Sequence, residues 1–188
     1  MPDSMEMANN DLANVTPTSG AFPEDVVLAP EYVASVLSYV KPEERRVIGA
    51  VARGLVLDLT MEQRSPPYTL RPVEYLSTAD LAMATAQAGQ LQLDHLVRTL
   101  DSPTARLIEP GELASAREHH LVFFLKFSVE FHRRHTASSY LLSLRLNRFR
   151  HTGSILVGRF DFTVPGHLQG SFIACVPYGE ALRDGLSD

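Results

Sequence analysis

The sequence predicts a single α+β domain in which an antiparallel sheet wraps around one central helix. Two features carry this prediction. A long helix with small side chains on nearly every side begins near residue 77, and four segments of alternating apolar and polar residues follow it. A chain of 188 residues with 45% apolar composition also fills one core of ordinary size.

The N-terminal residues 1–24 are rich in Asn, Asp, Ser, Thr and Pro and show no hydrophobic periodicity. We therefore expect a flexible tail over 1–24 and one domain over 25–188. The first residues have neither the basic nor the apolar stretch of a secretory signal, which indicates a cytoplasmic protein. No apolar run reaches the roughly 20 residues of a membrane-spanning helix, and the single cysteine, Cys175, excludes an internal disulfide.

The first elements of the domain are a short helix and a strand. Apolar residues at helical spacing between Tyr32 and Val40 follow Pro30, which suits a first turn. Residues 46–61 then alternate between apolar and smaller side chains, which predicts one long strand, bent at Gly54.

A loop with three prolines (QRSPPYTLRP, 63–72) leads to the central helix. Ser77 to Asp80 has the form of a capping box, with Asp in place of Glu, and the helix runs to about Leu100. Its first half consists largely of Ala, Met, Thr and Gly, so neighbouring backbone can approach it closely on several sides. We expect this helix to be enclosed.

After a polar bridge over 102–120, four strands are predicted at 121–131, 140–146, 156–164 and about 168–177. The first is the most regular, with apolar residues at every odd position from Leu121 to Phe131. Turn residues between the strands indicate a meander. A sheet that wraps around one helix is the hotdog fold; the alternatives are a different α+β roll and a cystatin-like cone with the helix lying across the sheet.

Three stretches resemble the FcoT-like thioesterase family across about residues 30–176. They are VLSYVKPEERRVIGAV, PPYTLRPVEYLSTADLAMATAQAGQL and LKFSVEFHRRHTASSYLLSLRL. The resemblance implies a hotdog protein that acts on long-chain acyl thioesters. It also implies functional positions at Tyr39 and Tyr68, with Ser77 and Tyr75 standing where the family has Asn and His. Some relatives instead add glycine across the double bond of an enoyl-carrier-protein thioester, in isonitrile lipopeptide pathways.

Thioester chemistry needs a donor for the carbonyl oxygen and a group that activates the nucleophile. The unpaired N–H groups at the helix start and Ser77 are candidate donors, although Ser77 also suits a simple N-cap. Tyr68, in the proline loop, is a second donor or packs on the prolines. Glu74 and Asp80 are candidate general bases, with Asp80 also suited to the capping box. Tyr75 is expected either to form part of the wall of the site or to donate a hydrogen bond to the substrate.

Further polar residues are candidates for substrate binding. Gln87 lies in the small-residue half of the helix, where it orients a water or holds the helix to the sheet. Tyr39 is a core or a binding residue. Arg133 and Arg134 end one strand, and Arg148 and Arg150 end the next. One expectation is that the four gather at one end of the sheet, where they bind coenzyme phosphates or an acidic carrier protein. The alternative is that they are ordinary solvated strand ends.

Other classes of function are disfavoured by the sequence. A net charge of −5 and a pI near 5.8 argue against nucleic-acid binding. The seven histidines lack the spacing of a zinc site, so we expect neither a metal nor another cofactor. No GxSxG motif surrounds a serine, and Cys175 has no obvious basic partner, which disfavours serine or cysteine nucleophiles.

The leading hypothesis is therefore a hotdog enzyme that hydrolyses a fatty acyl thioester of coenzyme A or of an acyl carrier protein. The second hypothesis keeps the pocket and adds glycine or water to an enoyl thioester. The third is a non-catalytic acyl-binding protein. By analogy with hotdog proteins, we expect a homodimer or a higher assembly of dimers.

Overall fold

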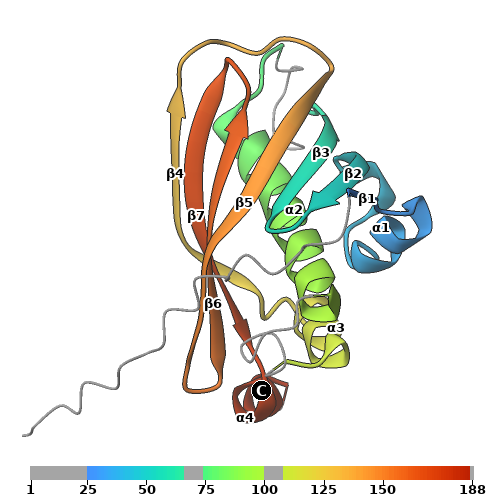
Figure 1. Cartoon of the computed structure of the whole chain (residues 1–188), viewed down its shortest axis with the longest axis vertical. Coiled ribbons are helices and arrows are strands. Elements are labelled where there is room, and N and C mark those ends of the chain that lie inside the picture. The colour runs from blue at the N-terminus through green and yellow to red at the C-terminus, as the bar shows by residue number, and fades with distance from the viewer. Residues whose placement is uncertain (1–24, 66–73, 100–107, 187–188) are drawn as a thin grey trace, which may run out of the picture.

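A seven-stranded antiparallel sheet curves around one long helix in the computed structural model, which describes residues 25–65, 74–99 and 108–186. The strand order is β1-β2-β3-β5-β6-β7-β4 (Figure 1). The strands are β1 Val26–Val27, β2 Val47–Arg53, β3 Val56–Glu62, β4 Phe123–Phe131, β5 Ser139–Thr152, β6 Ile155–Val164 and β7 Leu168–Pro177. The helices are α1 Pro30–Val36, α2 Thr78–Thr99, α3 Pro110–Glu118 and α4 Gly179–Gly185, with a 3-10 turn at Pro42–Glu44. The predicted α+β hotdog fold is confirmed.

Helix α2 is the enclosed helix that the sequence predicts. Ala84 and Ala88 have no exposed surface, and a Cβ at Gly89 would lie 2.9 Å from the ring of Phe172 on β7. Small side chains on α2 therefore let the aromatic side chains of the sheet come close to the helix backbone. The tail at 1–24 and residues 66–73 of the proline loop lie outside the described residues.

The predicted long strand over 46–61 is a hairpin, so that prediction was wrong. Gly54 adopts a positive φ of 60° and turns the chain, and β2 and β3 pair with Arg53 opposite Val56. The turn also changes which positions face the core. Ala50 and Ala52 are buried in β2, whereas Leu57 and Leu59 are buried in β3. Helix α1 is confirmed but ends at Val36 instead of continuing to Val40.

The predicted meander is correct for β5, β6 and β7 but wrong for β4. Strand β4 pairs with β7, so the chain between β4 and β5 crosses the end of the sheet (Figure 1). A bulge at Leu125 interrupts the register between β4 and β7. The alternation in β4 predicts a strand well, but it carries no information about which strand lies beside it.

Helix α3 lies within the segment that the sequence predicts to be a polar bridge. Glu109 and Glu112 form a capping box, and Pro110 occupies the first turn, where its missing N–H costs nothing. Only a few of its side chains are buried, among them Leu113 and Arg117. The apolar periodicity of this short helix is too weak to reveal it.

The C-terminal half of α2 is fixed by a buried carboxylate, Asp94. Its oxygens accept hydrogen bonds from Tyr32 Oη at 2.7 Å, Arg98 Nε at 2.6 Å and Arg117 Nη1 at 2.8 Å. Burial alone raises the pKa of Asp94, but the hydrogen bonds from Arg98, Tyr32 and Arg117 outweigh it and hold the pKa below its ordinary value. The three donors come from α1, α2 and α3, so Asp94 ties three helices together.

We expect Asp94→Asn to lower the free energy of unfolding by about 3 kcal/mol at pH 7, because the buried Arg117 loses its charged partner. A carboxylate with a lowered pKa stabilises the fold above its unfolded pKa of about 3.9, and this contribution is lost as the pH falls through the folded pKa. The difference between wild type and variant should therefore shrink below about pH 4. Urea denaturation at several pH values checks this. If the free energies of unfolding of wild type and variant differ by the same amount at pH 7 and at pH 3, the prediction is wrong.

Candidate functional site

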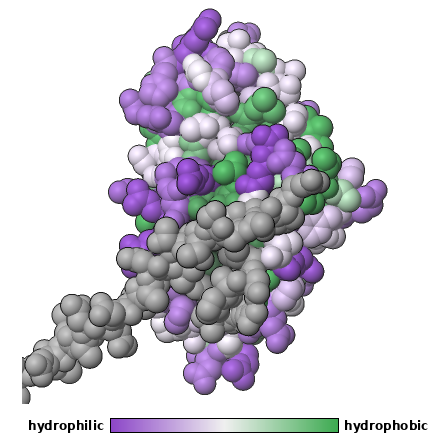
Figure 2. Space-filling view, in the orientation of Figure 1, coloured by the Kyte–Doolittle hydropathy of each residue, from purple (hydrophilic) through white to green (hydrophobic). Residues whose placement is uncertain are grey.

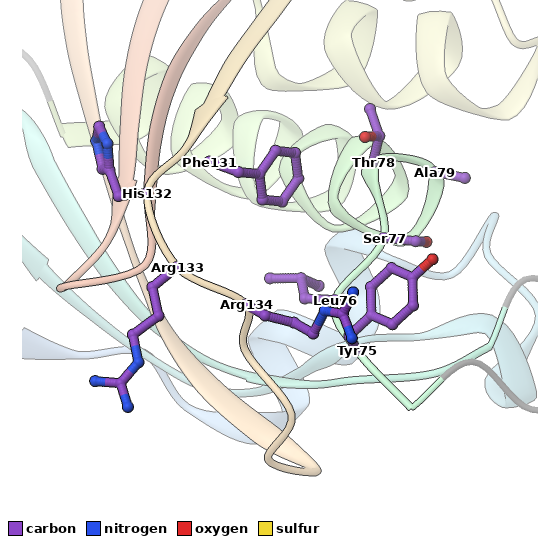
Figure 3. A pocket seen from close by; sticks show the side chains of 9 residues that line it. All are labelled: Tyr75, Leu76, Ser77, Thr78, Ala79, Phe131, His132, Arg133 and Arg134. Carbon is purple, nitrogen blue, oxygen red and sulfur yellow. The ribbon is translucent and has the colours of Figure 1, made fainter.

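A pocket of about 580 Å³ lies between the N-terminus of α2 and the chain that leaves β4 (Figure 3). Its two walls come from segments more than fifty positions apart in the sequence. The lining residues are Tyr75, Leu76, Ser77, Thr78, Ala79, Phe131, His132, Arg133 and Arg134. Four of the predicted site residues, Tyr75, Ser77, Arg133 and Arg134, are therefore brought together.

The helix wall of the pocket begins at Ser77, which caps α2. The Asp80 N–H donates to Ser77 Oγ at 3.1 Å, and the Leu81 N–H donates to the Ser77 carbonyl at 2.9 Å. The N–H groups of Thr78 and Ala79 belong to the first turn, where a helix offers them no acceptor. Together with the helix dipole they make this end of the pocket partly positive. The site can thus stabilise negative charge on a bound oxygen.

Asp80 forms a buried ion pair. Arg46 Nε donates to Asp80 Oδ1 at 2.8 Å, the two side chains are 2% and 1% exposed, and the Arg64 N–H donates to the second oxygen at 3.2 Å. Burial raises the pKa of Asp80, and the contacts with Arg46 and Arg64 oppose that rise. The predicted capping box is therefore half formed, because the carboxylate turns to Arg46. Asp80 is absent from the pocket lining.

Neither Gln87 nor Tyr39 is among the residues that line the pocket. Gln87 Oε1 accepts the Arg46 N–H at 2.8 Å, and Gln87 Nε2 donates to the Glu44 carbonyl at 2.9 Å. Both ends of this buried amide hold α2 to the segment that leads into β2. Tyr39 packs against the core, and burial raises its pKa to about 12.

The second wall of the pocket consists of the end of β4 and the residues after it. Phe131 is 44% exposed and points toward α2, and Leu76 is buried beneath it (Figure 3). The Arg134 guanidinium lies 4.9 Å from the centroid of the Tyr75 ring, a cation–π contact that joins the two walls. An apolar surface and the Arg134 guanidinium therefore lie next to the helix start, whereas the side chain of Arg133 extends away from it (Figure 3).

The expected gathering of four arginines does not occur. Strands β5, β6, β7 and β4 are successively antiparallel, so β4 and β5 run in opposite directions. Arg133 and Arg134 follow the end of β4 at the pocket, whereas Arg148 and Arg150 lie near the other end of the sheet. The prediction assumed that the ends of consecutive strands meet, and that is not so for two antiparallel strands.

The sequence did not identify Phe131 and His132, the lining residues at the end of β4. Phe131 was predicted only as one of the apolar residues on one face of its strand, and its exposure follows from the edge position of β4. His132 lies on the opposite side of β4 from Phe131 (Figure 3). Glu74 is exposed and directly precedes the lining residue Tyr75. Tyr68 lies outside the described residues, so its donor role stays a prediction.

No group of three or more His, Cys, Asp or Glu side chains in the described ranges is arranged to hold a metal ion. None of the described helices is both long and apolar enough to cross a membrane. On the face shown in Figure 2, hydrophobic patches alternate with hydrophilic residues over the upper half of the molecule.

Comparison with known proteins supports the fold. No family model matches this chain, and no curated protein matches it. The chain resembles the dehydratase heterocomplex ApeI:P of Xenorhabdus doucetiae, with a TM-score of 0.51, 12% identity and coverage of 83% of this chain and 97% of that chain. The dehydratase domain of RzxB from Pseudomonas fluorescens aligns with a TM-score of 0.49 and 11% identity over 81% of this chain. The match spans about half of the Pseudomonas chain, 50%. A hypothetical thioesterase protein with coenzyme A from Streptococcus pneumoniae aligns with a TM-score of 0.35 and 12% identity, over 66% of this chain and 80% of that chain.

Proposed function

We propose that this protein is an enzyme that hydrolyses a long-chain fatty acyl thioester, carried on coenzyme A or on an acyl carrier protein. The observation that carries the proposal is the pocket itself, which joins a helix N-terminus, two arginines and an apolar wall. A fatty acyl thioester presents the complementary groups: a carbonyl oxygen, an anionic carrier and an apolar chain. The hotdog fold of the chain supports the same class of substrate.

In the proposed reaction the thioester carbonyl oxygen faces the start of α2. Water attacks the carbonyl carbon, and the oxyanion that forms is stabilised by the N–H groups of Thr78 and Ala79 and by the Ser77 hydroxyl. Glu74 takes a proton from the attacking water. As the C–S bond breaks, that proton passes to the departing thiolate. Tyr68 is proposed as a further donor to the carbonyl.

The remaining lining residues are proposed to hold the two ends of the substrate. Arg133 and Arg134 pair with phosphates of coenzyme A or with acidic groups of a carrier protein. Phe131 and Leu76 contact the acyl chain, and Tyr75 supports Arg134 through its ring. Asp80 and Gln87 are proposed to act by positioning the start of α2, and Tyr39 is proposed to act through the packing of the core. The enzyme is proposed to work as a homodimer or a higher assembly of dimers.

A second candidate reaction is the addition of glycine or water to an enoyl thioester. Arg134 at the pocket supports it, because a guanidinium binds the carboxylate of an amino acid. Polarising the carbonyl also stabilises the enolate that forms when a nucleophile adds to the β-carbon. Two of the similar structures are dehydratases, and dehydration is the reverse of adding water. A protein that binds acyl chains without turnover is the third candidate.

The test is mass spectrometry of the purified protein incubated with dodecanoyl-CoA and dodec-2-enoyl-CoA, and with the corresponding carrier-protein thioesters, with and without glycine. Free dodecanoic acid is the result that hydrolysis predicts. A product that is heavier by the mass of glycine or of water, formed from the enoyl substrates alone, would support addition instead of hydrolysis. Binding of these thioesters without any product would support the third candidate, a protein that binds acyl chains without turnover.

A further inference from the structure

The outer face of the sheet, which points away from α2, carries a group of cations on β4, β5 and β6 (Figure 1). Side chains of paired residues point to the same side of a sheet, so the pairing register arranges them in rows across the strands. One row runs from β5 to β4 and contains Arg148, Arg159, Ile173 and Lys126. Arg145 and Arg150 lie on the same face, in the two neighbouring rows. All five cations are exposed, and because they come from three strands no basic run in the sequence reveals them.

Positive charge is in excess on this face. Arg148 and Arg159 lie directly opposite each other on β5 and β6, and like charges in such a pair are unfavourable. Among the described side chains of this row and the two rows beside it, Asp161 is the one carboxylate, and it accepts a hydrogen bond from Asn147. Five cations and one carboxylate therefore share one face of a chain whose net charge is −5.

Large apolar side chains lie beside these cations. Phe123 and Leu125, at the start of β4, are 43% and 62% exposed. Phe123 belongs to the same row of the outer face as Arg150. Leu125 is the bulged residue next to Lys126. Exposed apolar side chains that are grouped in this way mark a contact surface, and here the group is bordered by positive charge.

We infer that this face binds the surface of a membrane that contains anionic lipids. Phospholipid headgroups present many phosphates in one plane, and guanidinium groups bind phosphate well. Each Lys or Arg close to an anionic membrane adds to the affinity. Phe123 and Leu125 then enter the boundary between the headgroups and the acyl chains. Anionic groups alone, on a nucleic acid or on an acidic protein, would neutralise the cations but leave both apolar side chains in water.

The test is flotation of the purified full chain with lipid vesicles. Vesicles of phosphatidylcholine alone are compared with vesicles that also contain phosphatidylglycerol. The protein is expected to float with the anionic vesicles only, and added salt should release it. Because the net charge of −5 opposes binding to an anionic surface, binding must come from a local positive face.

Charge reversal locates the contact. Arg159→Glu should lower the affinity for anionic vesicles by about tenfold or more. The variant should fold, because it places an opposite charge across from Arg148. The control is Lys41→Glu, which makes the same change of charge at an exposed lysine between α1 and β2. It should leave the affinity close to that of wild type.

A second pair of variants tests the apolar contact. Leu125→Ser should lower the affinity for anionic vesicles by about fivefold, because less apolar area enters the membrane. Leu141→Ser is the control. Leu141 is equally exposed, at 62%, but lies at the end of β5 that is farther from Arg148 and Arg150. This variant should bind the vesicles as wild type does.

Failure of the wild-type protein to bind anionic vesicles would overturn the inference. Equal losses in Arg159→Glu and Lys41→Glu, or in Leu125→Ser and Leu141→Ser, would also overturn it. So would a wild-type protein that binds a single-stranded oligonucleotide or an acidic carrier protein but no vesicles. Membrane binding of this kind is independent of the proposed function. The flotation experiment contains no thioester, so its outcome is separate from that of the thioesterase assay.

Discussion

Replacing Arg46 with alanine is expected to lower the free energy of unfolding by about 3–5 kcal/mol, because it leaves the buried Asp80 carboxylate without its charged partner. The Arg46 side chain also donates to the Glu44 carbonyl and lies against the Met83 sulfur at 3.8 Å. Its loss therefore removes a link between α2 and the segment before β2. Urea denaturation, followed by circular dichroism, measures the change.

The matched control is Arg53→Ala. Arg53 also forms ion pairs, with Asp25 and Asp58, but its side chain is 53% exposed. Exposed pairs contribute about 0–1 kcal/mol, so this variant should change stability little. Replacing both buried partners, as Arg46→Met with Asp80→Leu, should recover part of the loss, because no buried charge is then left alone. If Arg46→Ala and Arg53→Ala lower the free energy of unfolding equally, the burial of the Arg46–Asp80 pair has no effect on stability.

Thr78→Trp is expected to lower kcat/KM for dodecanoyl-CoA by about 100-fold or more, because a large ring at the helix start displaces the thioester from the N–H groups that polarise it. Thr78 lies across the pocket from Phe131 (Figure 3) and is exposed, so the substitution should leave the fold intact. Release of free thiol measures the rate. Unchanged circular dichroism and melting temperature would confirm that the variant is folded.

The control for this variant is Thr99→Trp at the opposite end of α2. Thr99 is also exposed, and its Oγ1 donates to the His95 carbonyl within the helix at 2.7 Å. The two positions are separated by about 30 Å of helix, so Thr99→Trp should leave turnover unchanged. If Thr78→Trp retains the wild-type rate, the carbonyl does not bind at the start of α2.

Local patterns in the sequence were sufficient to predict much of the fold. Helix α2 has a capping serine and a long run of small residues, and β5, β6 and β7 alternate clearly. Features that depend on distant contacts were not predictable in this way. Pairing of β4 with β7 depends on which surfaces pack together, and the turn at Gly54 resembled a bend within one strand. Helix α3 buries too few apolar side chains to show periodicity.

The candidate site was predictable where a local motif marks it. Ser77 and Tyr75 belong to the entrance of α2, which the capping motif reveals. The partner of Asp80 was not predictable, because Arg46 lies 34 positions earlier and nothing near Asp80 points to it. Arg133 and Arg134 line the pocket, but the expected cluster with Arg148 and Arg150 does not form. The predicted antiparallel meander already places the ends of consecutive strands at opposite ends of the sheet, so the expected cluster was inconsistent with it.

The most direct test of the central claim is a crystal structure with S-dodecyl-coenzyme A, in which a thioether replaces the cleavable thioester. The proposed function predicts the sulfur beside Thr78 and Ala79 at the start of α2, the dodecyl chain against Phe131 and Leu76, and phosphates near Arg133 or Arg134. A ligand bound away from the start of α2 would contradict the account, even if the protein hydrolyses acyl thioesters.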